Sequence, residues 1–364
     1  SYSPYADSDG FTRLAKVERF GLEDGRYPAF FSFEYSQGLG VECDENDGCQ
    51  RPYMVEMGTI NANFTSGQAT LLDINGDALP DILDTSQDGD HRFFINVANE
   101  DGSSAFVTTP VFSSVGTKSS HDLRVAGVQV LDINGDGFTD LVNAGNANVL
   151  INKGNGDWEQ LGSVPGVSEL AEALADDFDG EDGELQSLRF IDFDNDKLID
   201  VMRSTQEDTS FFKNEGSAGF ESVTGTSIGA GFAEDNLQLA DINGDGLLDA
   251  VKLQIGVLSY RLNLGRGKWA GWVDVTGIPV NDLAELALTS LDDINGDARA
   301  DLVVVSGNEV TYSLNRNGQS FGRPVTIIND DLTGVIPIRD STTQVFFADM
   351  NANGSSDVVW IQQD

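Results

Sequence analysis

Histidine, cysteine and basic residues are scarce in this chain, and long apolar runs are missing. Among 364 residues there are two histidines, two cysteines and 21 lysines and arginines, against 60 aspartates and glutamates. The formal net charge of −39 argues against nucleic acid or an anionic membrane surface as the main partner. No stretch reaches the roughly 18 apolar residues of a membrane-spanning helix, so we expect no membrane insertion.

The sequence offers little for catalysis. His91 and His121 lie in no nucleophile or metal motif, and neither a Gly-x-Ser-x-Gly elbow nor a phosphate-binding glycine loop is present. Paired carboxylates could hydrolyse glycosides, but the clustered ones are better explained as metal ligands. His91, beside Asp88 and Asp90, is expected in a surface loop. We therefore predict that the chain is not an enzyme.

Cys43 and Cys49 are separated by five residues, and no cysteine or histidine cluster completes a zinc site. A small disulfide loop is favoured, which would suit an oxidising exterior; the alternative is two free thiols. Residues 176–184 are densely acidic. We interpret them as a solvated insertion, with a further cation loop as the alternative.

One nine-residue pattern recurs six times. Its clearest copy runs from Asp241 to Asp249, with oxygen-bearing side chains at positions one, three, five and nine. The first residues of successive copies are 59, 60, 49, 52 and 56 residues apart. A period of this size is typical of stacked or radial repeats.

The spacing of these oxygens suits Ca²⁺, which takes six to eight oxygen ligands at about 2.3–2.6 Å. Positions one, three, five and nine would supply side-chain oxygens and position seven a carbonyl. The alternative is a tight hairpin turn, which Asn-Gly also favours without metal. We predict five or six Ca²⁺ ions. The last loop, with two acidic residues, is expected to bind most weakly or to stay empty, and the third has the most acidic ligands. The predicted ligands are Asp73, Asn75, Asp77, Leu79, Asp81, Asp132, Asn134, Asp136, Phe138, Asp140, Asp192, Asp194, Asp196, Leu198, Asp200, Asp241, Asn243, Asp245, Leu247, Asp249, Asp293, Asn295, Asp297, Arg299, Asp301, Asp349, Asn351, Asn353 and Asp357.

Short β-prone runs flank every loop, and a third run carrying Asn follows five of them. This pattern predicts an all-β propeller with four-stranded blades and a Ca²⁺ loop between the first two strands of each. We expect six blades, with seven as the alternative, in a single domain. Residues 1–66 would close the last blade and carry the small Cys loop, and residues 67–364 would form the six repeats.

The six loops resemble the FG-GAP/VCBS repeats of integrin α chains and of many secreted bacterial proteins. The resemblance covers residues 68–364. It implies structural Ca²⁺ at the matching positions and a secreted or cell-surface protein, of bacterial origin.

Two segments, 257–265 and 346–354, also resemble the SpvB/TcB-type proteins, the B components of bacterial toxin complexes. That resemblance implies a propeller that docks on a partner subunit. The tyrosine-aspartate repeats of that family are missing here, so it implies at most an excised module.

We therefore predict a non-catalytic docking module for a protein partner. Two alternatives remain, integrin-like adhesion and a carbohydrate-binding or carbohydrate-cleaving propeller. In the carbohydrate alternative, tryptophans would stack on a glycan, although they could equally be blade core. The tryptophans concerned are Trp158, Trp269, Trp272 and Trp360.

Overall fold

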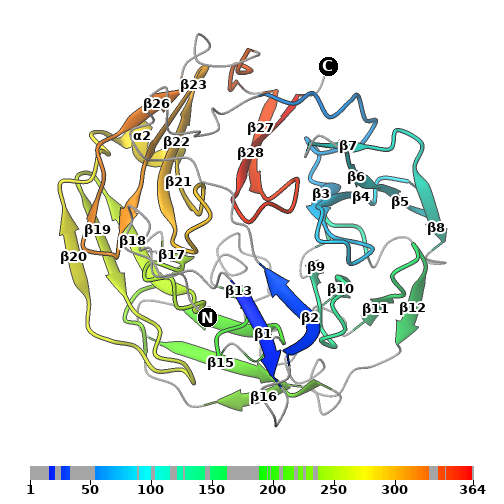
Figure 1. Cartoon of the computed structure of the whole chain (residues 1–364), viewed down its shortest axis with the longest axis horizontal. Helices are drawn as coiled ribbons and strands as arrows, with labels where there is room; N and C mark the ends of the chain where they lie inside the picture. Colours follow the sequence, from blue (N-terminus) through cyan, green and yellow to red (C-terminus); the bar gives the residue numbers. More distant parts are fainter. Residues whose placement is uncertain are drawn as a thin grey trace.

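The chain folds into blades that stand around a common centre (Figure 1). Within each blade the strands pair antiparallel, and the first strand lies nearest the centre. This computed structural model describes residues 16–20, 26–32, 54–87, 90–99, 103–114, 121–125, 128–143, 148–161, 188–194, 196, 198–204, 208–216, 220–223, 227–232, 237–327, 335–340 and 342–362.

Five blades have four strands each. Blade 1 contains β3 (Ala69–Leu72), β4 (Asp81–Asp84), β5 (Asp90–Phe94) and β8 (Val111–Ser114). Blade 2 contains β9 (Val128–Leu131), β10 (Asp140–Asn143), β11 (Asn148–Asn152) and β12 (Trp158–Leu161). Blade 3 contains β13 (Leu188–Ile191), β14 (Asp200–Ser204), β15 (Thr209–Asn214) and β16 (Phe220–Val223). Blade 4 contains β17 (Leu237–Ala240), β18 (Asp249–Gln254), β19 (Val257–Arg261) and β20 (Val273–Thr276). Blade 5 contains β21 (Thr289–Asp292), β22 (Asp301–Ser306), β23 (Glu309–Ser313) and β26 (Val325–Ile327).

The sixth repeat forms a sheet of only two strands, β27 (Thr343–Ala348) and β28 (Asp357–Gln362). It occupies the place in the ring between blade 5 and blade 1 (Figure 1). The described residues thus hold five four-stranded blades, and the prediction of six, or seven, is wrong. The reason is that a complete blade also needs a third and a fourth strand. In the described part of the chain β28 pairs with β27 and with no further strand.

Short pieces complete the description. Three further two-stranded sheets pair β1 (Lys16–Phe20) with β2 (Arg26–Ser32), β6 (Asn96–Ala98) with β7 (Ser104–Phe106), and β24 (Asn315–Arg316) with β25 (Ser320–Phe321). Helix α2 (Leu283–Leu288) begins after Asp282, whose carboxylate accepts two backbone N–H groups of the first turn. No described helix combines the length and apolar character needed to span a membrane. The cysteine pair and the acidic stretch 176–184 lie outside the described residues.

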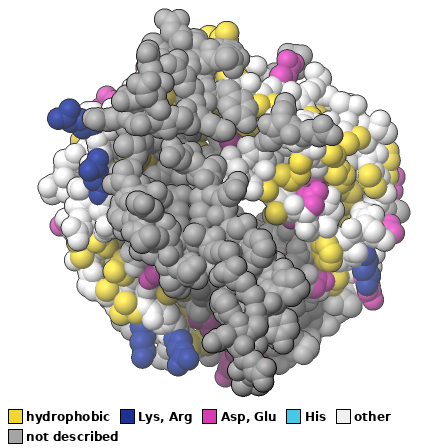
Figure 2. All heavy atoms as spheres, viewed as in Figure 1, with side chains coloured by type: hydrophobic (Ala, Val, Ile, Leu, Met, Phe, Trp, Pro, Cys, Tyr) yellow, Lys and Arg dark blue, Asp and Glu magenta, His cyan; other side chains and the backbone are white. Residues whose placement is uncertain are grey.

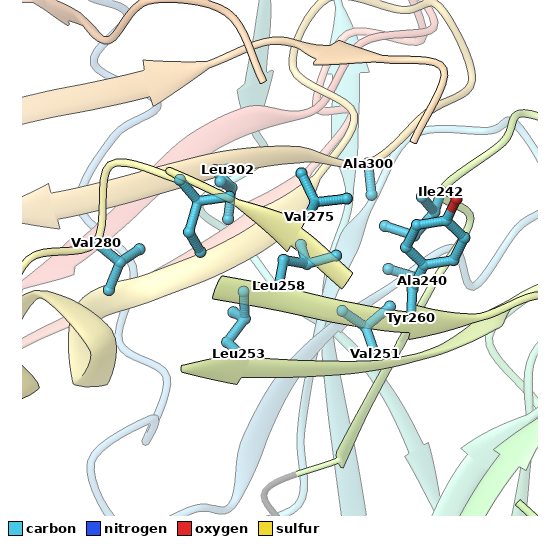
Figure 3. Packing of buried hydrophobic residues seen from close by; sticks show 11 residues of the cluster. Ala240, Ile242, Val251, Leu253, Leu258, Tyr260, Val275, Val280, Ala300 and Leu302 are labelled. Atoms are coloured by element: carbon cyan, nitrogen blue, oxygen red, sulfur yellow. The ribbon is translucent and has the colours of Figure 1, made fainter. Parts of the chain in front are cut away.

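Apolar side chains between neighbouring blades make the core. In Figure 3, Val251, Leu258 and Val275 of blade 4 lie against Ala300 and Leu302 of blade 5. The second strands β4 and β10 are buried at every residue, because each lies inside its sheet and between two blades. Burial of this apolar surface, at about 25 cal/mol per Å², holds the blades side by side.

The lead-in to blade 1 packs on the sixth repeat. The rings of Phe64 and Phe346 meet edge to face at 5.7 Å, and Gln344 Nε2 donates to the carbonyl of Phe64 at 3.2 Å. Ile361 joins the same apolar cluster. These contacts link the first and last parts of the described ring.

His91 is buried, contrary to its expected place in a surface loop. It lies on β5 with 2% of its surface exposed, and its ring meets that of Trp158 edge-on at 5.9 Å. Burial is the main reason that its pKa falls to about 4. The neighbouring His121 is also buried. The only two histidines of the chain therefore lie in the core beside blade 1, and His91 is neutral at pH 7.

The face seen in Figure 2 carries apolar side chains on its described part over blade 1. Exposed apolar residues of that blade are Val97, Val107, Val111 and Phe112. Acidic and basic side chains on the described part are dispersed rather than gathered.

Candidate metal centres

Each nine-residue loop is wound around the carboxylate at its first position. In the fourth loop, Asp241 Oδ1 accepts the N–H of Gly244 at 2.7 Å, and Oδ2 accepts that of Gly246 at 2.8 Å. Both glycines have φ near +80°, a conformation that glycine adopts without strain. Asp245 Oδ1 accepts the N–H of Leu247 at 2.9 Å. These local hydrogen bonds hold the side chains of positions one and five within one small turn.

The aspartate at position nine begins the second strand and is buried. Asp249 is 0% exposed; its Oδ2 accepts the N–H of Ile242 at 3.0 Å and its Oδ1 that of Asn263 at 2.8 Å. Burial, with the charges of Asp245 and Asp241, raises its pKa to about 7 against the lowering effect of the two N–H groups. The equivalent pKa values rise to about 7 for Asp81, Asp140 and Asp200 and to about 8 for Asp301, again chiefly by burial.

The asparagine after the third strand links each loop to the preceding blade. Asn214 donates its backbone N–H to Asp200 of its own blade at 2.7 Å, and its side-chain Nδ2 to the carbonyl of Ile133 in the loop of blade 2 at 2.8 Å. Its Oδ1 accepts the N–H of Gly216 at 2.9 Å. We call the set of side-chain bonds to the preceding loop the asparagine belt. It comprises Asn96 to Met350, Asn152 to Ile74, Asn214 to Ile133, Asn263 to Phe193 and Asn315 to Ile242.

The asparagine belt has one gap among the described residues. The bond from Asn96 to Met350 ties blade 1 to the sixth loop, so that loop takes part in the ring. In the described part of the chain, no third strand follows β28 and no belt asparagine reaches the carbonyl of Ile294. Ser356 donates its N–H to the carbonyl of Asp293 at 2.7 Å across this junction, as Ala300 does to the carbonyl of Asp241 between blades 4 and 5. Among the described residues, the junction between blade 5 and the sixth sheet therefore keeps this backbone bond but lacks the belt bond.

The third loop brings its predicted ligands closest together. Asp192, Asp194 and Asp200 each offer a carboxylate oxygen, and these oxygens lie within 4.8 Å of one another. Asp194 Oδ1 is buried and has no hydrogen-bond partner among the described residues. Oxygen-only donor sets suit hard cations such as Ca²⁺. The residues present therefore fit a hard divalent ion, which would neutralise carboxylates that burial otherwise penalises.

The other loops do not bring three carboxylates within that distance, as far as the described residues go. In loops one, two, four and five, the position-three asparagine instead donates its Nδ2 to the position-five aspartate. In the sixth loop, Asn353 stands at position five and accepts the N–H of Ser355 at 2.9 Å.

The residue at position seven, predicted to offer its carbonyl to the ion, also makes a hydrogen bond within its loop and a packing contact with the preceding loop. Its N–H donates to position five, as Phe138 does to Asp136 at 2.9 Å. The Phe138 ring also lies over Gly76 of the preceding loop, where an added Cβ would come within 2.8 Å of it. This contact helps explain why position seven is apolar in four loops.

The side-chain contacts of two basic residues with the loops, Lys213 on β15 and Arg299 at position seven of loop five, were not predicted from the sequence. Lys213 Nζ lies 2.5 Å from Asp194 Oδ2 and 2.6 Å from Asp196 Oδ2. Arg299 Nη2 lies 2.6 Å from Asp297 Oδ2, with both side chains 5% exposed. For Lys213 the signal was a basic residue at a repeat position that is aliphatic in the other four complete blades, and for Arg299 it was a basic residue at a position that is apolar in loops one to four.

Comparisons with known proteins give a family for part of the chain and a fold for the whole. Residues 192–251 and 293–360 match the model of the FG-GAP-like repeat. The chain thus carries FG-GAP-like repeats in a β-propeller arrangement. Among curated proteins, none is significantly similar to this chain.

Similar solved structures include chains of toxin complexes and a lectin. The Tc holotoxin pore of Photorhabdus luminescens is 19% identical with a TM-score of 0.64, over 99% of this chain and 16% of that one. The TcdB2-TccC3 structure without its hypervariable C-terminal region is 18% identical with a TM-score of 0.50, over 96% and 16%. An Agrocybe aegerita lectin that recognises non-reducing terminal N-acetylglucosamine is 18% identical with a TM-score of 0.56, over 81% and 75%. The chain spans about one sixth of the toxin chains. At these identities the likeness shows the propeller fold.

Proposed function

We propose that this chain is a calcium-stabilised, non-catalytic β-propeller that acts as a docking module for a protein partner in a secreted bacterial toxin complex. The observation that carries the proposal is the likeness to the Tc holotoxin chain, which extends over 99% of this chain. The FG-GAP-like repeats and the absence of a catalytic motif in the sequence agree with it.

The calcium part of the proposal has its own physical basis. In the five complete blades the position-nine aspartate is fully buried among backbone donors, and a divalent ion would offset the cost of its charge. The same aspartate accepts from the asparagine that ties its blade to the previous one. An ion that fixes the loop would therefore stabilise the junction between blades as well.

Calcium binding can be measured through stability. Ligand that binds only the folded state stabilises it by about 2.7 kcal/mol per site at 100 times Kd. We expect the melting temperature to fall markedly when calcium is replaced by a chelator at constant ionic strength, and to recover when calcium is restored. An unchanged melt would refute structural calcium.

The docking role calls for a different experiment. Sequencing the gene on both sides of the codons for Ser1 and Asp364 tests the toxin-complex assignment directly. Tyrosine-aspartate repeats in the same reading frame would support it. A stop codon directly downstream, with a signal sequence directly upstream, would contradict it and favour a self-contained secreted propeller.

Glycan binding is the second candidate, because the lectin also has this fold. Trp269 is buried, and Trp158 packs on His91 and Phe93, so these tryptophans serve the core. Trp272 is 36% exposed, with Lys252 Nζ 5.1 Å from its ring centre. Binding on a glycan array that Trp272→Ala abolishes would support this candidate. The adhesion alternative has no separate observation in its favour.

We propose further that residues 1–66 help to close the ring, so that the six repeats of residues 67–364 act as one domain. Contacts of Phe64 with Phe346 and Gln344 of the sixth sheet support this. Deletion of residues 1–66 should then weaken the whole propeller in one cooperative transition. A deletion that leaves the melting temperature unchanged would contradict it.

A further inference from the structure

Lys213 stands where other repeats place an aliphatic side chain. The residue before the belt asparagine is Ile95, Ile151, Leu262 or Leu314 in the other four complete blades. In blade 3 the lysine reaches the loop of its own blade, and its ammonium contacts the carboxylates of positions three and five. Position three is also unusual in this loop, because it is an aspartate where the other five loops have asparagine.

In the fifth loop, Arg299 likewise stands where other loops have an apolar residue. It occupies position seven, where loops one to four have leucine or phenylalanine. Its Nη2 contacts Asp297, and its Nη1 donates to Asn317 Oδ1 at 2.6 Å. Its aliphatic part still lies over Gly244 of the preceding loop, as an apolar side chain would. The buried guanidinium of Arg299 thus contacts Asp297, a predicted metal ligand.

We propose that Lys213 and Arg299 are built-in counter-ions that hold loops three and five when no divalent ion is bound, so that these loops fill with calcium after loops one, two and four. The proposal rests on the calcium binding proposed above. In loop three, four aspartates with Lys197 and Lys213 give −4 + 2 = −2, one negative charge fewer than loop four, whose three aspartates give −3. In loop five, three aspartates and one arginine give −3 + 1 = −2.

Linkage gives the sign of the effect on calcium affinity. In the metal-free loop, the ammonium of Lys213 reduces the repulsion between neighbouring carboxylates. In the metal-bound loop, it repels the divalent ion bound to the same carboxylates. A group that stabilises the metal-free form more than the metal-bound form lowers metal affinity by that difference. Removing the lysine should therefore loosen loop three without calcium and tighten its calcium binding.

Hydrogen exchange with mass spectrometry over a calcium series tests this in the full chain, because each loop falls in a different peptide. In the wild type, peptides of loops one, two and four should become protected at lower calcium than those of loops three and five. Lys213→Leu should lower the midpoint of loop three about tenfold, since a unit charge near the ligands has gone. It should also speed loop-three exchange in calcium-free buffer.

Matched variants separate charge from packing. Lys153→Leu removes the lysine that follows the belt asparagine of blade 2 and pairs with Glu159 rather than with a loop, so it should leave every midpoint unchanged. The triple variant Lys213→Leu with Asp194→Asn and Lys197→Gly has the ligand set and the loop charge of loop four and should match its midpoint.

Three results would overturn the proposal. The first is that all loops share one midpoint in the wild type, and the second is that Lys213→Leu leaves loop three unchanged with and without calcium. The third is that Lys213→Leu raises the loop-three midpoint. If no loop responds to calcium, the proposed calcium function fails, and faster calcium-free exchange in loop three alone would still identify Lys213 as its counter-ion.

Discussion

Blades 1 to 5 and the sixth sheet start from the same loop and the same two strands, yet they are buried differently. Every residue of β4 and β10 is buried, whereas no described residue of β28 is. The register is the same: the residue before position one pairs with position nine in blade 4, as Ala240 with Asp249, and in the sixth sheet, as Ala348 with Asp357. The loop motif therefore specifies a hairpin, and the third strand with its belt asparagine makes that hairpin a blade.

Substitution of the position-nine aspartate should give the largest difference in the loss of folding stability between a complete blade and the sixth sheet. With calcium at 100 times Kd, Asp249→Asn should lower the free energy of unfolding by about 2.7 kcal/mol through the loss of one bound ion. Asp357→Asn should cost under about 1 kcal/mol, because its loop has the weaker ligand set. Chemical denaturation in calcium measures both, and equal losses would contradict the difference.

The asparagine belt predicts the next largest effect. Asn214→Ala leaves the buried carbonyl of Ile133 without its donor, which should cost about 2 kcal/mol. Asn308→Ala, at an exposed turn between strands of blade 5, is the control and should change stability by under about 0.5 kcal/mol. Equal effects of the two variants would mean that the belt contributes nothing.

A matched pair of valines compares the packing of the two regions. Val201 on β14 and Val358 on β28 both follow the position-nine aspartate, and Val201 is 0% exposed while Val358 is half-buried. Val201→Ala should cost about 1.5–2 kcal/mol and Val358→Ala about half of that, from the apolar groups removed. Urea melts of the two variants give both values. A larger loss for Val358→Ala would indicate that further strands cover β28 in solution.

The smallest effect concerns pH. In metal-free protein the pKa of Asp249 is raised to about 7, so its contribution to stability is complete below the unfolded pKa of about 3.8 and is lost as pH rises through about 7. Asparagine resembles the protonated acid, so in metal-free protein the advantage of Asp249→Asn over wild type should be smaller at pH 5 than at pH 8, because the loss begins once the unfolded carboxyl ionises. At pH 8 without metal the variant should be more stable, on the order of 1 kcal/mol.

Calcium should reverse the sign of that difference at pH 8, because the ion needs the ionised carboxylate. Melts of both proteins at pH 5 and 8, with and without calcium, check this, and the opposing contribution of His91 cancels in each comparison. A wild type that is the more stable at pH 8 without metal would contradict the assignment.

Local features were predictable from the sequence, and long-range ones were not. The hairpin around each loop, such as β17 and β18 around residues 241–249, was predicted because apolar runs and turn residues are adjacent in the chain. The propeller fold followed from the period of the repeat and is confirmed.

The number of blades was wrong because it depends on which strands, distant in sequence, complete the sixth sheet. Burial of His91 was missed because a core position between blades depends on contacts with Trp158, 67 residues later. The contacts of Lys213 were hidden for the same kind of reason, since it reaches back to a loop that precedes it by about 20 residues. The predicted Ca²⁺ ligands remain predictions.

The asparagine belt always runs in one direction, from each blade back to the loop before it. Each of the five complete blades therefore brings one donor for its predecessor and one acceptor for its successor, so removing one whole blade leaves no additional unmatched group at the new junction. Duplicating a whole repeat adds one donor and one acceptor together. A ring joined in this way can change its number of blades by gain or loss of complete repeats, while a cut inside a repeat would leave a carbonyl without its asparagine.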